Sequence, residues 1–66
     1  MKFKERLKEL RIENGYTQKQ IATLLEISTT CFSGYEQGYR EPDLTMLIKI
    51  CKVLGVSADY LLGLTD

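Results

Sequence analysis

The residues of this chain best suited to chemistry are uncharged hydrogen-bonding groups between positions 29 and 37. At about 100° per residue, Thr29, Thr30, Ser33, Gly34 and Gln37 fall on one face of a helix. Exposed helix faces ordinarily carry Lys, Glu or Arg, yet this face has no charge in a chain that is 27% charged. Its small side chains would let another surface approach closely, and its hydroxyls and amide could read hydrogen-bonding edges. A weak helix tolerated by a small protein is the other interpretation, and the face alone favours neither.

Catalytic and metal-binding chemistry lack their usual groups. The sequence has no His, and Cys31 and Cys51 stand twenty positions apart, so a zinc site and a Cys–His pair both lack partners. A chain of 66 residues buries only about 60% of its unfolded surface, which leaves no room for a deep cleft. We therefore expect no enzyme, no metal and no cofactor. Both cysteines are expected to be small buried hydrophobes, because a redox role for Cys31 would need a lowered thiol pKa.

Composition indicates a folded chain, since 44% of the residues are hydrophobic and there is a single Pro. No apolar run is long enough for a membrane-spanning helix or for the hydrophobic region of a signal peptide. We therefore expect a cytoplasmic protein with no membrane partner.

Charge is divided unequally along the chain although it sums to zero. Residues 1–19 contain six basic and three acidic side chains, whereas residues 20–66 contain three basic and six acidic ones. Zero net charge argues against a polyanionic partner, but the basic leading segment could face one. A solvated helix face with internal salt bridges is the alternative interpretation of that segment.

Capping residues and glycines indicate the elements that position the 29–37 face. Phe3, Leu7 and Leu10 recur at helical spacing, which predicts a first helix that ends near Asn14, with Gly15 in the left-handed position.

A capping box predicts where the second helix starts. The Thr17 hydroxyl can cap the helix and Gln20 can reach back to the Thr17 backbone, so the helix begins at position 18. The apolar pattern stops at residues 26–28, which predicts a three-residue turn. Ser28 then caps a third helix that runs to about position 37, where Gly38 ends it.

Two further helices follow the same logic. Asp43 is a suitable N-cap for a fourth helix through position 54, and Ser57 for a short fifth helix. Five helices with connections of about two to six residues are typical of a compact all-α domain. The inward stripe of the fourth helix is expected to be Leu44, Leu47, Ile48, Cys51 and Leu54.

An ordered set of caps, turns and spacings thus runs through nearly the whole chain. Its members are Gly15-Tyr16-Thr17-Gln18-Lys19-Gln20-Ile21-Ala22, Ile27-Ser28, Tyr35-Glu36-Gln37-Gly38, Pro42 and Leu54-Gly55-Val56-Ser57-Ala58-Asp59-Tyr60-Leu61-Leu62. This set resembles the helix-turn-helix family of phage repressors and Cro proteins, the XRE-like regulators. The resemblance implies a compact, all-α, five-helix DNA-binding domain over residues 1–66, with its helix-turn-helix motif at about residues 17–37. The implied partner is double-stranded DNA, in the major groove of an operator half-site.

The resemblance also implies roles for individual residues. Gln18 matches a glutamine that bonds a DNA phosphate and braces the recognition helix, and Glu36 matches a residue used in internal bonding. Thr29 and Thr30 match positions that reach base edges. Ser33 and Gly34 match further groove-facing positions, and Gln37 matches a polar residue near the phosphates. The remaining DNA-binding candidates, which flank this face, are Thr17, Lys19, Tyr39 and Arg40.

The recognition helix departs from the family pattern at one position. Gly34 stands where relatives often have Arg, Lys or a long amide, and residues 29–37 contain no Arg or Lys, so the commonest guanine contact is absent. We expect specificity from threonine methyl contacts and from DNA shape, with a bias toward A·T steps. A selected motif with invariant guanines opposite Thr29 and Thr30 would contradict this.

The leading hypothesis is a sequence-specific transcription regulator, most simply a repressor that binds a palindromic operator as a homodimer. Tyr60, Leu62 and Leu64 are the expected self-association residues, and frayed apolar residues near the C-terminus are the alternative account of Leu62 and Leu64. The alternative is a protein-interaction module with the same fold, an adaptor or antitoxin-like partner, which zero net charge favours. The end of the sequence fits either a complete Cro-like protein or one half of a longer regulator.

Overall fold

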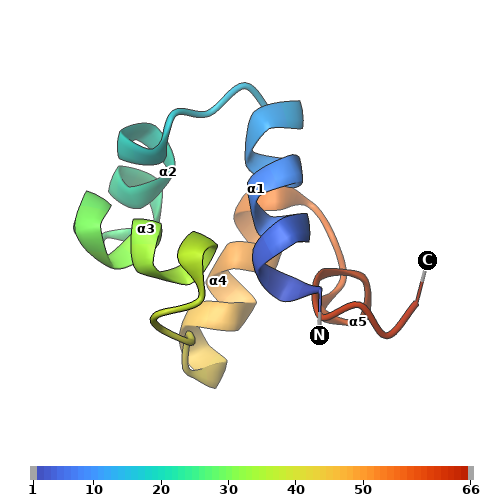
Figure 1. Ribbon diagram of the computed structural model, residues 1–66. Helices are drawn as coiled ribbons and strands as arrows, with labels where there is room; N and C mark the ends of the chain where they lie inside the picture. The colour runs from blue at the N-terminus through green and yellow to red at the C-terminus, as the bar shows by residue number, and fades with distance from the viewer. Residues whose placement is uncertain (1, 66) are drawn as a thin grey trace.

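Side-chain caps begin four of the five helices in residues 2–65, the part of the chain that this computed structural model describes (Figure 1). Oxygens of Thr17, Ser28, Asp43 and Ser57 each accept a hydrogen bond from the backbone N–H three residues on, at 2.8–3.1 Å. Met1 and Asp66, the end residues of the expected domain, lie outside the described residues. The helices are α1 (Phe3–Glu13), α2 (Gln18–Leu25), α3 (Thr29–Gln37), α4 (Leu44–Leu54) and α5 (Ala58–Leu61).

The turns that were predicted around α2 and α3 are present. The capping box is complete, because the Thr17 backbone N–H donates to Gln20 Oε1 at 2.8 Å. Glu26 ends α2 in the left-handed conformation, with φ of 61°, which costs a residue with a Cβ about 1–2 kcal/mol. Gly38 ends α3 with φ of 86°, a conformation that glycine adopts without that cost.

The helices pack so that α2 and α3 lie on the side of the molecule away from α5 and the chain ends (Figure 1). Helix α1 contacts α3 and α5, and α4 contacts α2 and α5. Every helix contributes to one core, so the arrangement of α2 and α3 depends on all five. The buried side chains are Phe3, Leu7, Leu10, Ile21, Ala22, Leu25, Phe32, Tyr35, Ile50, Leu54 and Leu61.

The inward stripe predicted for α4 is wrong in part. Leu44 is 79% exposed and Ile48 is 55% exposed, whereas Ile50 and Leu54 are buried. The helix is apolar on most of its circumference, so the sequence pattern did not define which side faces the core. Contacts with both α2 and α5 decide it. The predicted residues Leu47 and Cys51 lie half-buried at the edge of the core, and so does Cys31, so neither cysteine is fully buried.

We predict opposite outcomes for two isoleucines of α4. Ile50→Ala removes a fully buried side chain and should lower the free energy of unfolding by about 2–5 kcal/mol. Ile48→Ala, the matched control on the same helix, should lower it by less than about 1 kcal/mol because Ile48 is already exposed. Urea denaturation of dilute protein measures both. A larger loss for Ile48 would mean that the sequence-based stripe was right.

Candidate nucleic-acid interface

One face of α3 presents uncharged polar side chains to solvent. Thr29, Thr30 and Gln37 are exposed, and Ser33 is half-buried. Gln37 Nε2 donates to Ser33 Oγ at 2.9 Å, one helical turn back. The described geometry therefore gathers four of the five residues of the predicted face into one accessible strip.

Gly34 is the exception, and its predicted exposure is wrong. The residue is buried because the side chain of Arg40 lies across it. A Cβ built on Gly34 would stand 2.9 Å from Arg40 Cδ and 3.1 Å from Arg40 Cγ. The helical wheel could not foresee this, because the covering side chain comes from the loop after α3.

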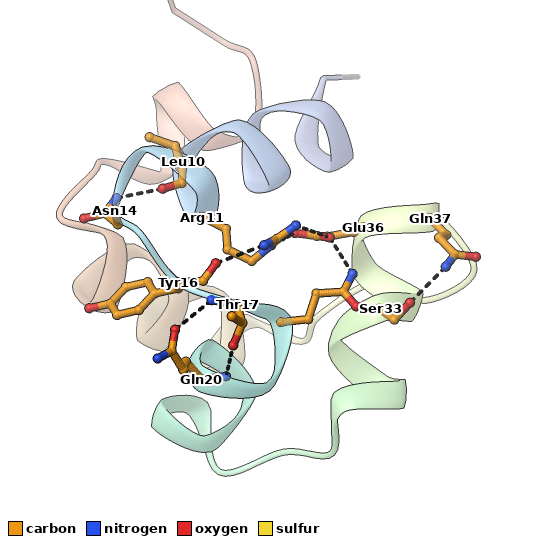
Figure 2. A network of polar contacts seen from close by, with 10 residues as sticks. Leu10, Arg11, Asn14, Tyr16, Thr17, Gln20, Ser33, Glu36 and Gln37 are labelled. Atoms are coloured by element: carbon orange, nitrogen blue, oxygen red, sulfur yellow. Dashed lines mark hydrogen bonds and ion pairs between the residues drawn. The ribbon is translucent and has the colours of Figure 1, made fainter.

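A largely buried ion pair holds α3 against α1. Arg11 Nε donates to Glu36 Oε2 at 2.7 Å, and the side chains of Arg11 and Glu36 are only 13% and 4% exposed. Arg11 also donates from its Nη1 atom to the Tyr16 carbonyl at 2.9 Å, which fixes the segment between α1 and α2 (Figure 2). Glu36 thus makes internal bonds, as the resemblance implied, whereas nothing in the sequence analysis pointed to Arg11 as its partner.

The same carboxylate orients Gln18. Gln18 Nε2 donates to Glu36 Oε1 at 2.8 Å, and only the amide nitrogen can donate to a carboxylate, so the amide has a single sensible orientation. Its NH₂ group retains a second hydrogen, which could reach an acceptor outside the protein. Helices α1, α2 and α3 therefore meet at Glu36, and Gln18 is held at the start of α2.

The remaining DNA-binding candidates from the sequence are accessible to a partner. Thr17, Lys19, Tyr39 and Arg40 are all exposed, as candidates for backbone contacts must be. Thr17 uses its hydroxyl oxygen as the α2 cap. Two further cations of α1, Lys4 and Lys8, line a shallow depression whose other lining residues are Gln37, Tyr39 and the acidic Glu5 and Glu36. These two lysines were not among the predicted DNA-binding residues, although they belong to the excess of positive charge in residues 1–19.

The expected self-association residues differ in accessibility. The Arg6 guanidinium lies over the Tyr60 ring, 4.3 Å from its centroid, and donates to the Tyr60 and Thr65 carbonyls. Tyr60 and Leu62 are half-buried, while Leu64 is 70% exposed. Tyr60 therefore serves to attach α5 and the following residues to α1, and Leu64 is the most accessible of the three.

The described residues offer little for nucleophilic or metal chemistry. Burial raises the pKa of the Tyr35 hydroxyl to about 12, and the neighbouring Cys31 thiol adds to the shift. Burial also raises the pKa of the Cys51 thiol, which lowers its nucleophilic fraction near neutral pH. Within residues 2–65, no three His, Cys, Asp or Glu side chains form a metal-binding group. No helix in the same range has the length and apolar character to cross a bilayer.

The fold and this strip define a helix-turn-helix domain, and comparison with known proteins gives the same result. The model of a helix-turn-helix family matches residues 7–61, so the chain belongs to that family, which is XRE-like and is not an enzyme class. It is a helix-turn-helix domain of the kind found in transcriptional regulators.

Relatives include regulators of bacteria and of phages. The HTH-type transcriptional regulator ImmR of Bacillus subtilis is 48% identical over 96% of this chain and 50% of its own length. A regulator derived from the SPbeta prophage of the same bacterium, YonR, is 47% identical over 91% of this chain and 56% of its own. The cryptic phage CTXphi transcriptional repressor RstR of Vibrio cholerae is 41% identical over 96% of this chain and 56% of its own. The chain thus spans about half the length of these curated relatives.

Solved structures have the same fold. A transcriptional regulator from Listeria innocua superposes with a TM-score of 0.87 at 34% identity, over 97% of this chain and 60% of that one. SinR, the master regulator for biofilm formation, solved in complex with DNA, superposes with a TM-score of 0.83 at 30% identity, over 91% of this chain and 97% of that one. These neighbours confirm the all-α, five-helix helix-turn-helix fold.

We predict that the buried ion pair behaves asymmetrically under mutation. Glu36→Gln should lower the free energy of unfolding by about 3–5 kcal/mol, because it removes the carboxylate that compensates the largely buried Arg11 charge. The double variant Arg11→Met, Glu36→Leu removes both charges and should be markedly more stable than Glu36→Gln alone. Urea denaturation measures this difference. Equal losses in both variants would mean that the pair contributes through packing rather than charge compensation.

Proposed function

We propose that this chain is the sequence-specific DNA-binding part of a cytoplasmic transcription regulator, most simply a repressor. The observation that carries the proposal is the exposed, uncharged strip of α3, held in place through Glu36 and flanked by cations. Small side chains let the helix backbone come close to base edges in the major groove. Repression would follow from occlusion of the polymerase at the operator.

Thr29 and Thr30 are the proposed base-reading residues. Each offers a hydroxyl to a base edge and a methyl to thymine, and both are exposed at the start of α3. Gln18, whose amide is oriented by Glu36, is a proposed phosphate ligand. Ser33 and Gln37 are bonded to one another and are proposed to contact the rim of the groove, together with Thr17, Lys19 and Tyr39.

Dimensions support a homodimer on a palindromic operator. Recognition helices of such regulators read half-sites about 34 Å apart, whereas the longest extent of the described chain is 28 Å. Two half-sites therefore require two copies, and a two-fold axis between them requires a palindromic operator.

The exposed apolar face of α4 is a proposed part of the dimer contact, in addition to Tyr60, Leu62 and Leu64. Leu44 and Ile48 line a groove with Val56 and Ala58. An antiparallel second copy centred on Ile48 would place Lys52 opposite Leu44 of its partner, next to the acidic cap Asp43. This charge complementarity favours a second copy of the chain as the occupant. Dimerisation through another surface, or binding of a different partner at this groove, is an alternative outcome of the Ile48→Lys experiment below.

A protein-interaction module remains the second candidate, because the net charge of the chain is zero. Phosphate contacts of one copy are limited to a few cations, which predicts a shallow dependence of affinity on salt. Absence of duplex binding at low and moderate salt, together with co-purification of another protein, would favour this candidate.

We predict that selection from a random duplex library returns a two-fold symmetric motif rich in A·T steps. On the selected duplex, Thr29→Ala and Thr30→Ala should each weaken binding by about tenfold. Thr45→Ala on α4 is the matched control and should bind like the unaltered chain. Titration of labelled duplex at 50 and 200 mM salt gives the affinities and the salt dependence. An asymmetric motif, or equal effects of the three substitutions, would contradict the proposed reading of DNA.

We predict that Ile48→Lys converts dimers to monomers, because it buries a charge in the apolar contact. Ile12→Lys is the matched control. Ile12 is similarly exposed but lies on α1, so the Ile12→Lys variant should dimerise like the unaltered chain. Leu64→Lys tests the contribution of the C-terminal residues. Sedimentation equilibrium with and without operator duplex measures all three. A monomeric unaltered chain on a duplex with both half-sites would overturn the proposed dimer.

A further inference from the structure

Gly34 has no conformational reason to be glycine. Its backbone lies within the regular α3 helix and outside the left-handed region, so any residue could adopt it, and Ala would favour the helix by about 1 kcal/mol. The space that a side chain at position 34 would need is already filled. The stem of Arg40 occupies the place of a side chain, since a Cβ on Gly34 would lie within 3.1 Å of two Arg40 carbons.

The backbone after α3 is fixed at the same point. The N–H groups of Gly38, Tyr39 and Arg40 all donate to the Gly34 carbonyl, the last two at 2.9 and 3.2 Å. Gly34 therefore anchors the loop through its carbonyl and seats the Arg40 stem on its bare Cα. Both contacts place the root of Arg40 beside the middle of the recognition helix.

The Arg40 guanidinium is the available one among the chain's three arginines. Arg6 donates to two backbone carbonyls, and Arg11 donates to Glu36 and the Tyr16 carbonyl. Within residues 2–65, the Arg40 guanidinium makes no hydrogen bond and no ion pair. Lys4 lines the same small depression as Arg40, so two cations share this flank of α3, together with the carboxylate of Glu41.

We infer that Gly34 is a positioning residue that holds the Arg40 guanidinium against an operator phosphate beside α3. The inference rests on the proposed DNA-binding function. A phosphate is favoured over a base because the Arg40 stem crosses α3 at Gly34, one turn after Thr30, whereas the first residues of a recognition helix are the ones that read base edges. Phosphate contacts position a protein on DNA without reading sequence.

A double-mutant cycle on the full chain tests this. Affinity for the selected operator duplex is measured between 50 and 300 mM salt for the unaltered chain, Gly34→Ala, Arg40→Ala and the double variant. Arg40→Ala should weaken binding about tenfold and reduce the salt slope by about 1. Gly34→Ala should weaken binding about three- to tenfold through displacement of Arg40, while its urea midpoint stays equal or rises. The double variant should match Arg40→Ala within about twofold.

Control measurements distinguish failure of the positioning role of Gly34 from failure of the proposed DNA binding. Lys2→Ala removes one positive charge near Gly63, on the α5 side of the molecule, and should leave the salt slope unchanged. Loss of the nuclear Overhauser contacts between Arg40 Hδ and residue 34 in Gly34→Ala would show directly that the stem has moved. Two outcomes would overturn the inference and leave DNA binding intact. One is that the affinity losses of Gly34→Ala and Arg40→Ala add in the double variant. The other is that Gly34→Ala binds the operator normally while Thr29→Ala does not. A changed base preference in Arg40→Ala would also overturn it, in favour of base reading. No duplex binding by the unaltered chain would overturn both proposals.

Discussion

The buried carboxylate of Glu36 joins three helices at one point. A carboxylate this far from solvent is costly unless every lone pair finds a donor, and here the donors come from Arg11 on α1 and Gln18 on α2. Small displacements of any of the three helices would leave a charge unpaired. The orientation of the α3 strip relative to α1 and to the start of α2 is therefore fixed by electrostatics as well as by the apolar core.

This use of charge explains how zero net charge can accompany a basic surface. Arg11 is paired with Glu36. The Arg6 guanidinium lies over the Tyr60 ring and donates to the Thr65 carbonyl. Lys4 and Lys8 of α1 and Arg40 of the loop after α3 are the cations that lie beside α3 residues in the described chain. The positive charge of residues 1–19 is thus partly structural, and only part of it can face a polyanion.

Sequence reasoning was most successful where the signal was local. The caps at Thr17 and Ser28 and the turn between them depend on residues within three or four positions, so the start of each helix followed from its own side chains. The buried side of α4 did not, because the helix is apolar around most of its circumference and α2 and α5 select the side. The predicted exposure of Gly34 was wrong for a related reason. A helical wheel assumes that no residue outside the helix covers its face, whereas the Arg40 side chain covers Gly34. Local patterns therefore predict elements, while long-range packing decides which faces stay open.

Two faces of different chemistry stay open in the described chain, the polar strip of α3 and the apolar groove of α4 and α5. A single copy offers few cations and one short strip, so its affinity for a half-site should be low. When two copies associate, binding of the second half-site becomes intramolecular, and the effective concentration can raise affinity by about 10²–10⁴ without new contacts. This gain requires that the two strips keep a fixed separation, and the rigid link from Glu36 to α1 and α2 supplies the rigidity within each copy. Weak electrostatics and the proposed dependence on dimerisation would thus both follow from the same small, internally neutralised fold.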